Sequence, residues 1–184
     1  MLCDPGHYCV NGVQVHILSV NTMSYLTLTY TYSLCDIFKV MCPEGTYGNS
    51  SGLATSVCSG YCLTGKYCPS GSTTPTACPT GSYCPDGKTK VFCPSGTFGA
   101  TRGLKDRSCS GLCTPGFYCP EGSVSPVSRY CPAGKYGEQA GLGDPACSGD
   151  CDAGFYCPGP PVAPNGQPTD RISNYSPNTK YENN

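Results

Sequence analysis

Hydrophobic residues follow two different patterns along this chain. Residues 26–32 read LTLTYTY, so large apolar side chains alternate with threonines, and a period of two predicts a short β-strand. Between Cys42 and Cys157 there is no isoleucine, and the scattered Leu, Val and Phe show no sustained 3.6-residue period. We therefore expect short strands and turns, and little helix, in that longer region.

Cysteine content changes this picture most. The chain has 17 cysteines in 184 residues, with 24 glycines and 18 prolines, and its few Leu, Ile, Val and Phe residues are too sparse for a single hydrophobic core. Cross-links would stabilise such a chain, and disulfides persist in oxidising compartments, which places the protein in the secretory pathway or outside the cell. The formal net charge of -1 excludes a basic nucleic-acid binder.

The amino terminus lacks the signal peptide expected of a secreted protein. Met1 is followed directly by Leu2 and Cys3, without the basic and apolar segments of a signal peptide. We interpret this as the mark of a fragment or of an incorrectly started gene model, rather than as evidence for a cytosolic protein.

One sequence unit recurs three times, with the pattern C-P-x-G-x-(Y/F)-G-x3-G-L-x4-C-S-G-x-C-x2-G-x-Y-C. The copies begin at Cys42, Cys93 and Cys131 and have identical internal spacing. Two smaller patterns are nested in the unit: a long loop, C-x15-C, and a short clip, C-x2-G-x-Y-C. The clip occurs five times, including a copy at Cys3 and an extra copy at Cys78. Cysteines have therefore been gained as a pair.

An inserted cysteine pair leaves all other cysteines partnered most easily if it bonds to itself. We therefore hypothesise that each clip and each long loop is closed by its own disulfide. Interleaved pairings preserve parity equally well, so the sequence alone leaves the connectivity open. The hypothesised pairs are Cys3 with Cys9, Cys42 with Cys58, Cys62 with Cys68, Cys78 with Cys84, Cys93 with Cys109, Cys113 with Cys119, Cys131 with Cys147 and Cys151 with Cys157, and Cys35 is left unpaired.

With its CPxGTYG, GL, CSGxC and GxYCPxG segments in this order, the chain resembles the ephrin-receptor-like cysteine-rich repeat. That repeat is a relative of the tumour-necrosis-factor-receptor and growth-factor-receptor cysteine-rich modules. The resemblance covers about residues 42–157, with a partial copy at residues 3–12. It implies a small disulfide-rich fold: tandem cysteine-rich modules of short strands and turns, with little helix, in an elongated rod. It also implies a module without enzyme activity, found within larger secreted or membrane-anchored proteins.

The repeats divide the chain into segments. Residues 13–41 depart from the pattern and contain Cys35; they predict a hairpin turning near Asn21, although translated non-coding sequence is an alternative, and the run is too polar for a membrane span. The segments are a partial repeat at 1–12, the insert at 13–41, repeat 1 with the extra clip at 42–92, repeat 2 at 93–130, repeat 3 at 131–158, and a flexible tail at 159–184.

Metal and catalytic chemistry fit the sequence less well. The chain contains no C-x2-C pair, and its two histidines lie outside the three full repeats, which argues against a zinc site, a thioredoxin-like redox site and a histidine-assisted nucleophile. Asp144, Asp150 and Asp152 form the only local carboxylate cluster, but their spacing does not match a helix-loop-helix calcium loop. We therefore expect no cofactor, no metal site and no enzyme activity.

These observations favour a non-enzymatic extracellular or cell-surface repeat array that acts as a stalk or as an adhesion or ligand-binding module for a protein or carbohydrate. The sequons at Asn49 and Asn174 are candidate glycosylation sites, and the variable positions 49–51, 100–102 and 138–140 are candidates for specificity. We expect no nucleic-acid partner and no membrane span in this chain. These expectations leave open a membrane anchor in a larger parent protein. The alternatives are an intracellular metal-binding or redox protein with reduced cysteines, and a secreted inhibitor.

Overall fold

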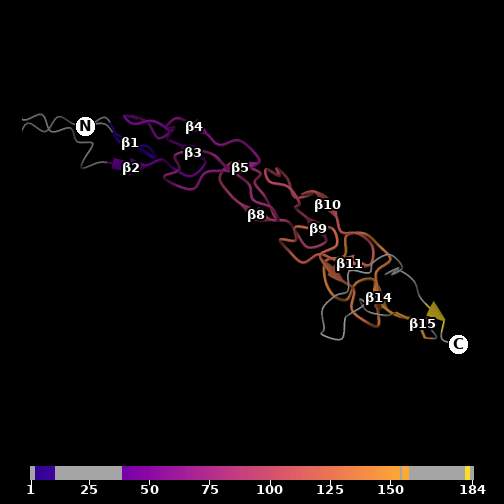
Figure 1. Cartoon of the computed structure of the whole chain (residues 1–184). Coiled ribbons are helices and arrows are strands. Elements are labelled where there is room, and N and C mark those ends of the chain that lie inside the picture. The colour runs from indigo at the N-terminus through magenta and orange to yellow at the C-terminus, as the bar shows by residue number, and fades with distance from the viewer. Residues whose placement is uncertain (1–2, 11–38, 154, 158–180, 183–184) are drawn as a thin grey trace, which may run out of the picture. The chain divides into compact units, whose positions relative to one another are not determined.

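The computed structural model describes residues 3–10, 39–153, 155–157 and 181–182. Within these ranges it has no helix, and its regular structure consists of strands of two or three residues (Figure 1). Eight disulfides cross-link the described residues. The predicted fold class, a small disulfide-rich protein built from short strands and turns, is confirmed.

The described strands pair in the order in which they occur, giving eight two-stranded sheets. Their bounds are β1 His7–Cys9, β2 Lys39–Met41, β3 Thr46–Tyr47, β4 Gly60–Tyr61, β5 Lys66–Tyr67, β6 Thr76–Ala77, β7 Ser82–Tyr83, β8 Val91–Phe92, β9 Thr97–Phe98, β10 Gly111–Leu112, β11 Phe117–Tyr118, β12 Arg129–Tyr130, β13 Lys135–Tyr136, β14 Gly149–Asp150, β15 Phe155–Tyr156 and β16 Tyr181–Glu182. Pairs this short are not stable alone, so other interactions must hold them.

A seven-residue segment, C-x-x-G-x-(Y/F)-(C/G), contains every odd-numbered strand, and we call it the turn element. The eight copies begin at Cys3, Cys42, Cys62, Cys78, Cys93, Cys113, Cys131 and Cys151. The fourth residue is glycine because the turn needs a left-handed backbone: in the seven copies whose glycine is described, φ lies between 73° and 85°. The C-P-x-G turn and the short clip of the sequence repeat are therefore the same structural element.

Successive turn elements are joined by the same two backbone hydrogen bonds at each of the seven described junctions. The turn glycine donates its N–H to the carbonyl of the seventh residue of the next element, as from Gly81 to Gly99 at 2.8 Å. Its own carbonyl accepts the N–H of the first cysteine of that next element, as from Cys93 to Gly81 at 2.9 Å. The N–H and the carbonyl of each turn glycine are therefore both hydrogen-bonded to the next turn element.

The fixed Gly-Leu pair of each long loop binds the turn element that precedes the loop. In repeat 2, Gly103 donates its N–H to the carbonyl of Cys78 at 2.8 Å, and the carbonyl of Leu104 accepts the N–H of Cys84 at 3.0 Å. The same two bonds join Gly52–Leu53 to the element at Cys3, and Gly141–Leu142 to the element at Cys113. The recurrence of Gly-Leu in the sequence thus reflects a contact between neighbouring elements.

The buried interior is composed of sulfur rather than hydrocarbon. Twelve cysteines and Phe117 are the only buried hydrophobic side chains among the described residues, and seven of those cysteines are fully buried. Phe117 packs against Tyr130 with ring centroids 4.5 Å apart. Large side chains elsewhere, such as Tyr61, Leu63 and Leu112, are exposed. The buried hydrophobic side chains are therefore almost entirely those of the disulfides.

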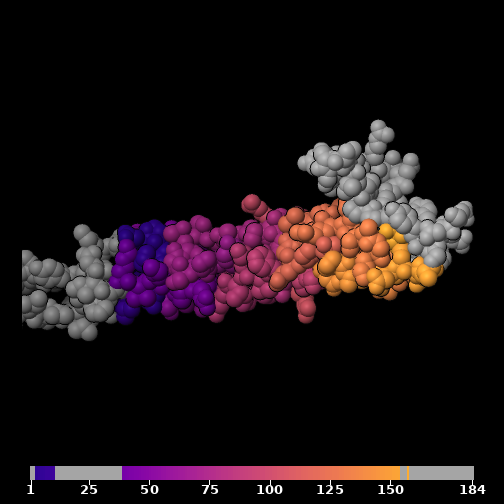
Figure 2. Space-filling view, turned by 90° about the horizontal axis from the view of Figure 1, so that it is seen from below, coloured from indigo at the N-terminus to yellow at the C-terminus, as the bar shows by residue number. Residues whose placement is uncertain are grey.

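The chain forms two compact units. Unit 1 comprises Met1–Leu63, Tyr67–Thr76 and Asp86–Thr89, and unit 2 comprises Thr64–Lys66, Ala77–Pro85 and Lys90–Asn184. The boundary between them falls inside the segment predicted as repeat 1 with its extra clip. Within unit 2 the surface colours change in chain order from magenta to orange (Figure 2), so consecutive modules of that unit are spatial neighbours.

Two predicted segments lie largely outside the described residues. The insert at 13–41 is described only at β2, which pairs with β1, so the predicted hairpin near Asn21 is not covered. Of the predicted tail, only β16 is described, and it pairs with β15 in an antiparallel register. No alternation or turn motif in the tail predicts that pair.

The turn glycines provide a stability test with a matched control. A methyl group at Gly81 would collide with the carbonyl of Gly122, whereas a methyl at Gly134 would meet none of the described residues within 4 Å, although the φ values of 73° and 81° are similar. We expect Gly134→Ala to lower the free energy of unfolding by about 1–2 kcal/mol through backbone strain. We expect Gly81→Ala to lower it by a further ~1–3 kcal/mol through the collision.

The measurement is the guanidinium midpoint of each variant, followed by circular dichroism with the disulfides intact. Equal midpoints for Gly81→Ala and Gly134→Ala would show that the Gly122 carbonyl does not penalise a methyl group at residue 81.

Candidate functional site

The candidate site is the set of cysteines, and the structure brings together each of the eight pairs that the sequence spacing predicts. Their Cα–Cα separations are 5.8–6.2 Å, within the range that a disulfide spans without moving the backbone.

The disulfides are of two kinds, which differ in sequence separation. Five pairs are six residues apart, and we call them the clip disulfides: Cys3–Cys9, Cys62–Cys68, Cys78–Cys84, Cys113–Cys119 and Cys151–Cys157. Three pairs are sixteen residues apart, and we call them the loop disulfides: Cys42–Cys58, Cys93–Cys109 and Cys131–Cys147.

The seventh residue of each turn element decides which kind of disulfide it forms. Where that residue is cysteine, as at Cys68, it pairs with the first cysteine of the same element. Where it is glycine, at Gly48, Gly99 and Gly137, the first cysteine pairs instead with a residue sixteen positions further on. A Cβ placed on Gly99 would lie 2.8 Å from Sγ of Cys93. That is close to the distance of about 3 Å between a Cβ and the opposite sulfur of a disulfide.

The second cysteine of each loop disulfide has an uncommon backbone. Cys58, Cys109 and Cys147 have φ values of 55°, 52° and 53°, and they are the only non-glycine residues with positive φ in the described parts of the chain. Each lies in a tight turn in which its N–H binds the carbonyl three residues earlier, 3.1 Å away for Cys109 and Asp106. All three are partly exposed, whereas their partners, the first cysteines of the loop disulfides, are buried.

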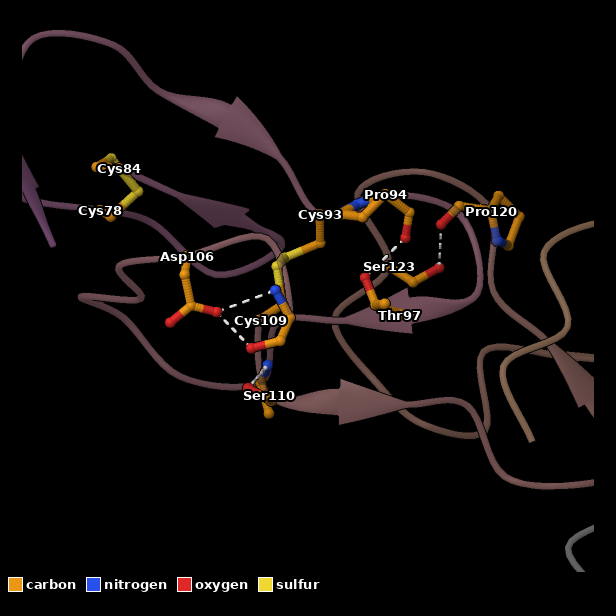
Figure 3. Close-up of a disulfide and its surroundings, with 12 residues drawn as sticks. Cys78, Cys84, Cys93, Pro94, Thr97, Asp106, Cys109, Ser110, Pro120 and Ser123 are labelled. Atoms are coloured by element: carbon orange, nitrogen blue, oxygen red, sulfur yellow. Dashed lines mark hydrogen bonds between the residues drawn. A yellow bond between two sulfur atoms is a disulfide. The ribbon is translucent and has the colours of Figure 1, made fainter. Parts of the chain in front are cut away.

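Figure 3 shows this turn in repeat 2. The Asp106 carboxylate accepts hydrogen bonds from both the amide and the hydroxyl of Ser108, and these bonds hold the pKa of Asp106 below its ordinary value. In repeat 3 the corresponding Asp144 accepts the N–H of Ala146 at 2.8 Å. An aspartate three residues before the cysteine thus stabilises the turn that positions it.

Sequence reasoning missed the role of the serine in the CSG motif. The hydroxyl of Ser59 accepts the N–H of Asn49 at 3.0 Å, and Ser110 and Ser148 accept the N–H of Ala100 and Glu138 at the same distance. These three bonds begin the variable tips at 49–51, 100–102 and 138–140, whose nine residues are all exposed. The invariance of this serine in the three copies was the available signal.

The other predicted site residues are placed as follows. Asn49 is exposed in its tip, while Cys35 and Asn174 lie outside the described residues. Asp150 forms an ion pair with Lys135 at 2.5 Å. Among the residues that the structure describes, no group of three or more His, Cys, Asp or Glu side chains is arranged to hold a metal ion.

Comparisons with known proteins add no assignment: no family model and no curated protein matches the chain. In the described part of the chain, no helix has the length and apolar character needed to cross a bilayer.

The geometry at Gly99 predicts that a loop element can be converted into a clip element. In the double variant Gly99→Cys, Cys109→Ser, we expect a new disulfide between Cys93 and the introduced cysteine, because the new Cβ would lie 2.8 Å from Sγ of Cys93. The Gly81 amide nitrogen, 2.9 Å from that Cβ, must shift by a few tenths of an ångström to admit it. The check is peptide mass mapping of the non-reduced protein, with the natural Cys78–Cys84 clip as the internal reference. A free Cys93 in a folded variant would show that the two element types are not interchangeable.

Proposed function

We propose that the chain is a non-enzymatic extracellular cysteine-rich repeat array, part of a surface or secreted protein, acting as a stalk or as an adhesion or ligand-binding module. The observation that carries the proposal is the interior, in which disulfide-bonded cysteines replace apolar side chains. Dense disulfide bonding of this kind is typical of extracellular domains.

The physical reason is the cost of ordering so many residues without a core. In the simplest account, each loop disulfide, with a separation of 16 residues, removes about 3 kcal/mol of unfolded-chain entropy, and each clip disulfide, with a separation of 6, removes about 2 kcal/mol. Reduced cysteines would leave sheets of two-residue strands with little apolar burial to stabilise them. A reducing compartment would therefore remove the main support of the fold. An oxidising environment is the one in which this sequence is stable.

The family proposal rests on motif order in the three repeats. The CPxG turn, the Gly-Leu pair, the CSG motif and the clip follow one another with constant spacing, as in the ephrin-receptor-like repeat that the chain resembles. The contacts of the Gly-Leu pair and of the CSG serine give each motif a structural role. We propose on this basis that the chain is an array of such repeats.

The three variable tips are the surfaces that we propose for ligand contact. Each tip is held by the same backbone bond to a serine hydroxyl, yet the side chains differ: Asn-Ser-Ser at 49–51, Ala-Thr-Arg at 100–102 and Glu-Gln-Ala at 138–140. A constant backbone that presents different exposed side chains suits contact with a protein or a carbohydrate, because the side chains can vary without disturbing the disulfides.

The oxidation state of the cysteines tests the extracellular proposal directly. For the protein expressed through a secretory route, we expect about one alkyl group per chain without reduction, from Cys35, because sixteen cysteines are cross-linked. Complete reduction before alkylation is expected to add 17 groups, the full cysteine count. Intact mass spectrometry of the denatured protein measures both numbers.

Extensive alkylation without reduction would contradict the proposal and favour the intracellular alternative. Zinc content after native purification would then separate a metal-binding protein from a redox protein.

Asn49 provides a second test of the same environment. Asn49 and the two serines of its sequon are exposed, so we expect an N-linked glycan there when the chain passes through the secretory pathway. The measurement is the mass that the peptide containing residue 49 loses on treatment with a peptide:N-glycanase, which Asn49→Gln should abolish whether or not Asn174 also carries a glycan. A matched positive control is Ala100→Asn with Arg102→Ser, which creates a sequon at the equivalent tip; a glycan at residue 100 but none at 49 would refute the assignment.

A further inference from the structure

The loop disulfides differ from most clip disulfides in access to solvent. Each loop disulfide has one partly exposed sulfur-bearing residue, at Cys58, Cys109 or Cys147. By contrast, both cysteines are buried in four of the clips, which we call the buried clips: Cys3–Cys9, Cys62–Cys68, Cys78–Cys84 and Cys113–Cys119. A thiolate must reach a sulfur atom to begin exchange, so exposure determines which disulfides react first.

Backbone conformation acts in the same direction. The exposed cysteine of every loop disulfide is held in the left-handed region at φ of 52–55°, which L-residues other than Asn and Asp seldom adopt. Once its disulfide opens, this residue is free to leave that conformation. Strained and exposed disulfides have the higher reduction potentials and are the labile ones.

The loop disulfides also secure contacts between neighbouring elements. The Gly103–Leu104 pair, which binds the preceding Cys78–Cys84 element, lies inside the loop closed by Cys93–Cys109. Without that disulfide, the far end of the loop would be held by hydrogen bonds alone: the two-residue pairing of β9 with β10 and the bonds of Ser110 to Phe98 and Ala100. A two-stranded pairing this short is weak alone. Opening the disulfide therefore loosens the attachment of one element to the next.

From these three observations we propose that the loop disulfides are thiol–disulfide exchange sites that a dithiol opens while the buried clips stay intact. One thiolate of the dithiol attacks the sulfur of the partly exposed cysteine, Cys109 for example, and Cys93 leaves as a thiolate. The second thiolate of the reagent then attacks its own sulfur in the mixed disulfide and releases Cys109. Two electrons pass to the protein, and the reagent becomes a disulfide.

Limited reduction of the native protein tests the proposal. The oxidised protein is exposed to dithiothreitol without denaturant, samples are quenched with N-ethylmaleimide at successive times, and the remaining cysteines are labelled with iodoacetamide after full reduction. We expect the three loop pairs to acquire maleimide at least about tenfold faster than the Cys78–Cys84 and Cys113–Cys119 clips, whose cysteines are fully buried. Equal or faster labelling of these clips would overturn the proposal.

The clip-forming variant Gly99→Cys, Cys109→Ser is the matched control. It replaces one exposed loop disulfide by a clip, so maleimide labelling of Cys93 should slow to the rate of Cys78, while Cys58 and Cys147 in the same molecules stay fast. Where peptide mapping shows Cys93 bonded to the introduced cysteine, rapid labelling of Cys93 would overturn the proposal. If the variant does not fold, the comparison within the natural chain still decides.

Amide hydrogen exchange tests the structural consequence. After limited reduction, the Gly103 amide, which binds the carbonyl of Cys78, should lose protection, whereas the Gly81 amide, which binds the carbonyl of Gly99, should keep it. Loss of protection at both would show general unfolding and contradict selective opening. Extensive maleimide labelling before any dithiothreitol is added would refute the disulfide framework and the proposed function together, whereas a clip-first order would refute this inference alone.

Discussion

The covalent bond between two sulfur atoms is the interaction on which the rest of this structure depends. In most small domains, apolar side chains exclude water and so determine where strands and turns can form. Among the described residues here, every buried hydrophobic side chain except Phe117 belongs to a half-cystine, and the strands are too short to exist without these cross-links. Each disulfide fixes the two ends of a turn, and the turn then places backbone donors and acceptors where the next turn can use them.

Glycine is the second requirement, and it serves two different purposes. The fourth residue of each turn element needs positive φ, as at Gly81. The seventh residue of a loop element, such as Gly99, has no such need; it is glycine because the sulfur of Cys93 occupies the space that its Cβ would take. The identity of the residue at this position, cysteine or glycine, distinguishes clip elements from loop elements. Cysteine and glycine alone thus produce both the clip disulfides and the longer-range loop disulfides.

Cysteine content predicted the disulfide-rich class, and the inserted pair at Cys78 and Cys84 suggested the pairs that the structure contains, although the sequence alone left the connectivity open. Cysteines six residues apart around a glycine turn are close in space, whereas the loop pairs needed the repeat spacing as a guide. The equivalence of the CPxG turn and the clip was not predicted, because the two differ at the seventh residue. That residue is cysteine in the clips and glycine, such as Gly99, in the loop elements, so an alignment on cysteines does not match them. The part played by the Gly-Leu pair was also missed, because its recurrence shows that the position is fixed but does not show which backbone groups it bonds. The pairing of β15 with β16 brings together residues far apart in sequence, and no local motif announces such contacts.

The loop disulfides also determine how the chain responds to a pulling force. When the two ends of the chain are pulled apart, force passes through the bond between Cys93 and Cys109, and the intervening residues carry no load. The sequence separation of 16 in each loop corresponds to about 50 Å of extended chain that remains stored while the bond is closed. A surface protein built from such loops would lengthen in discrete steps under tension, and its chemical environment, rather than the strength of its packing, would decide when each step is released.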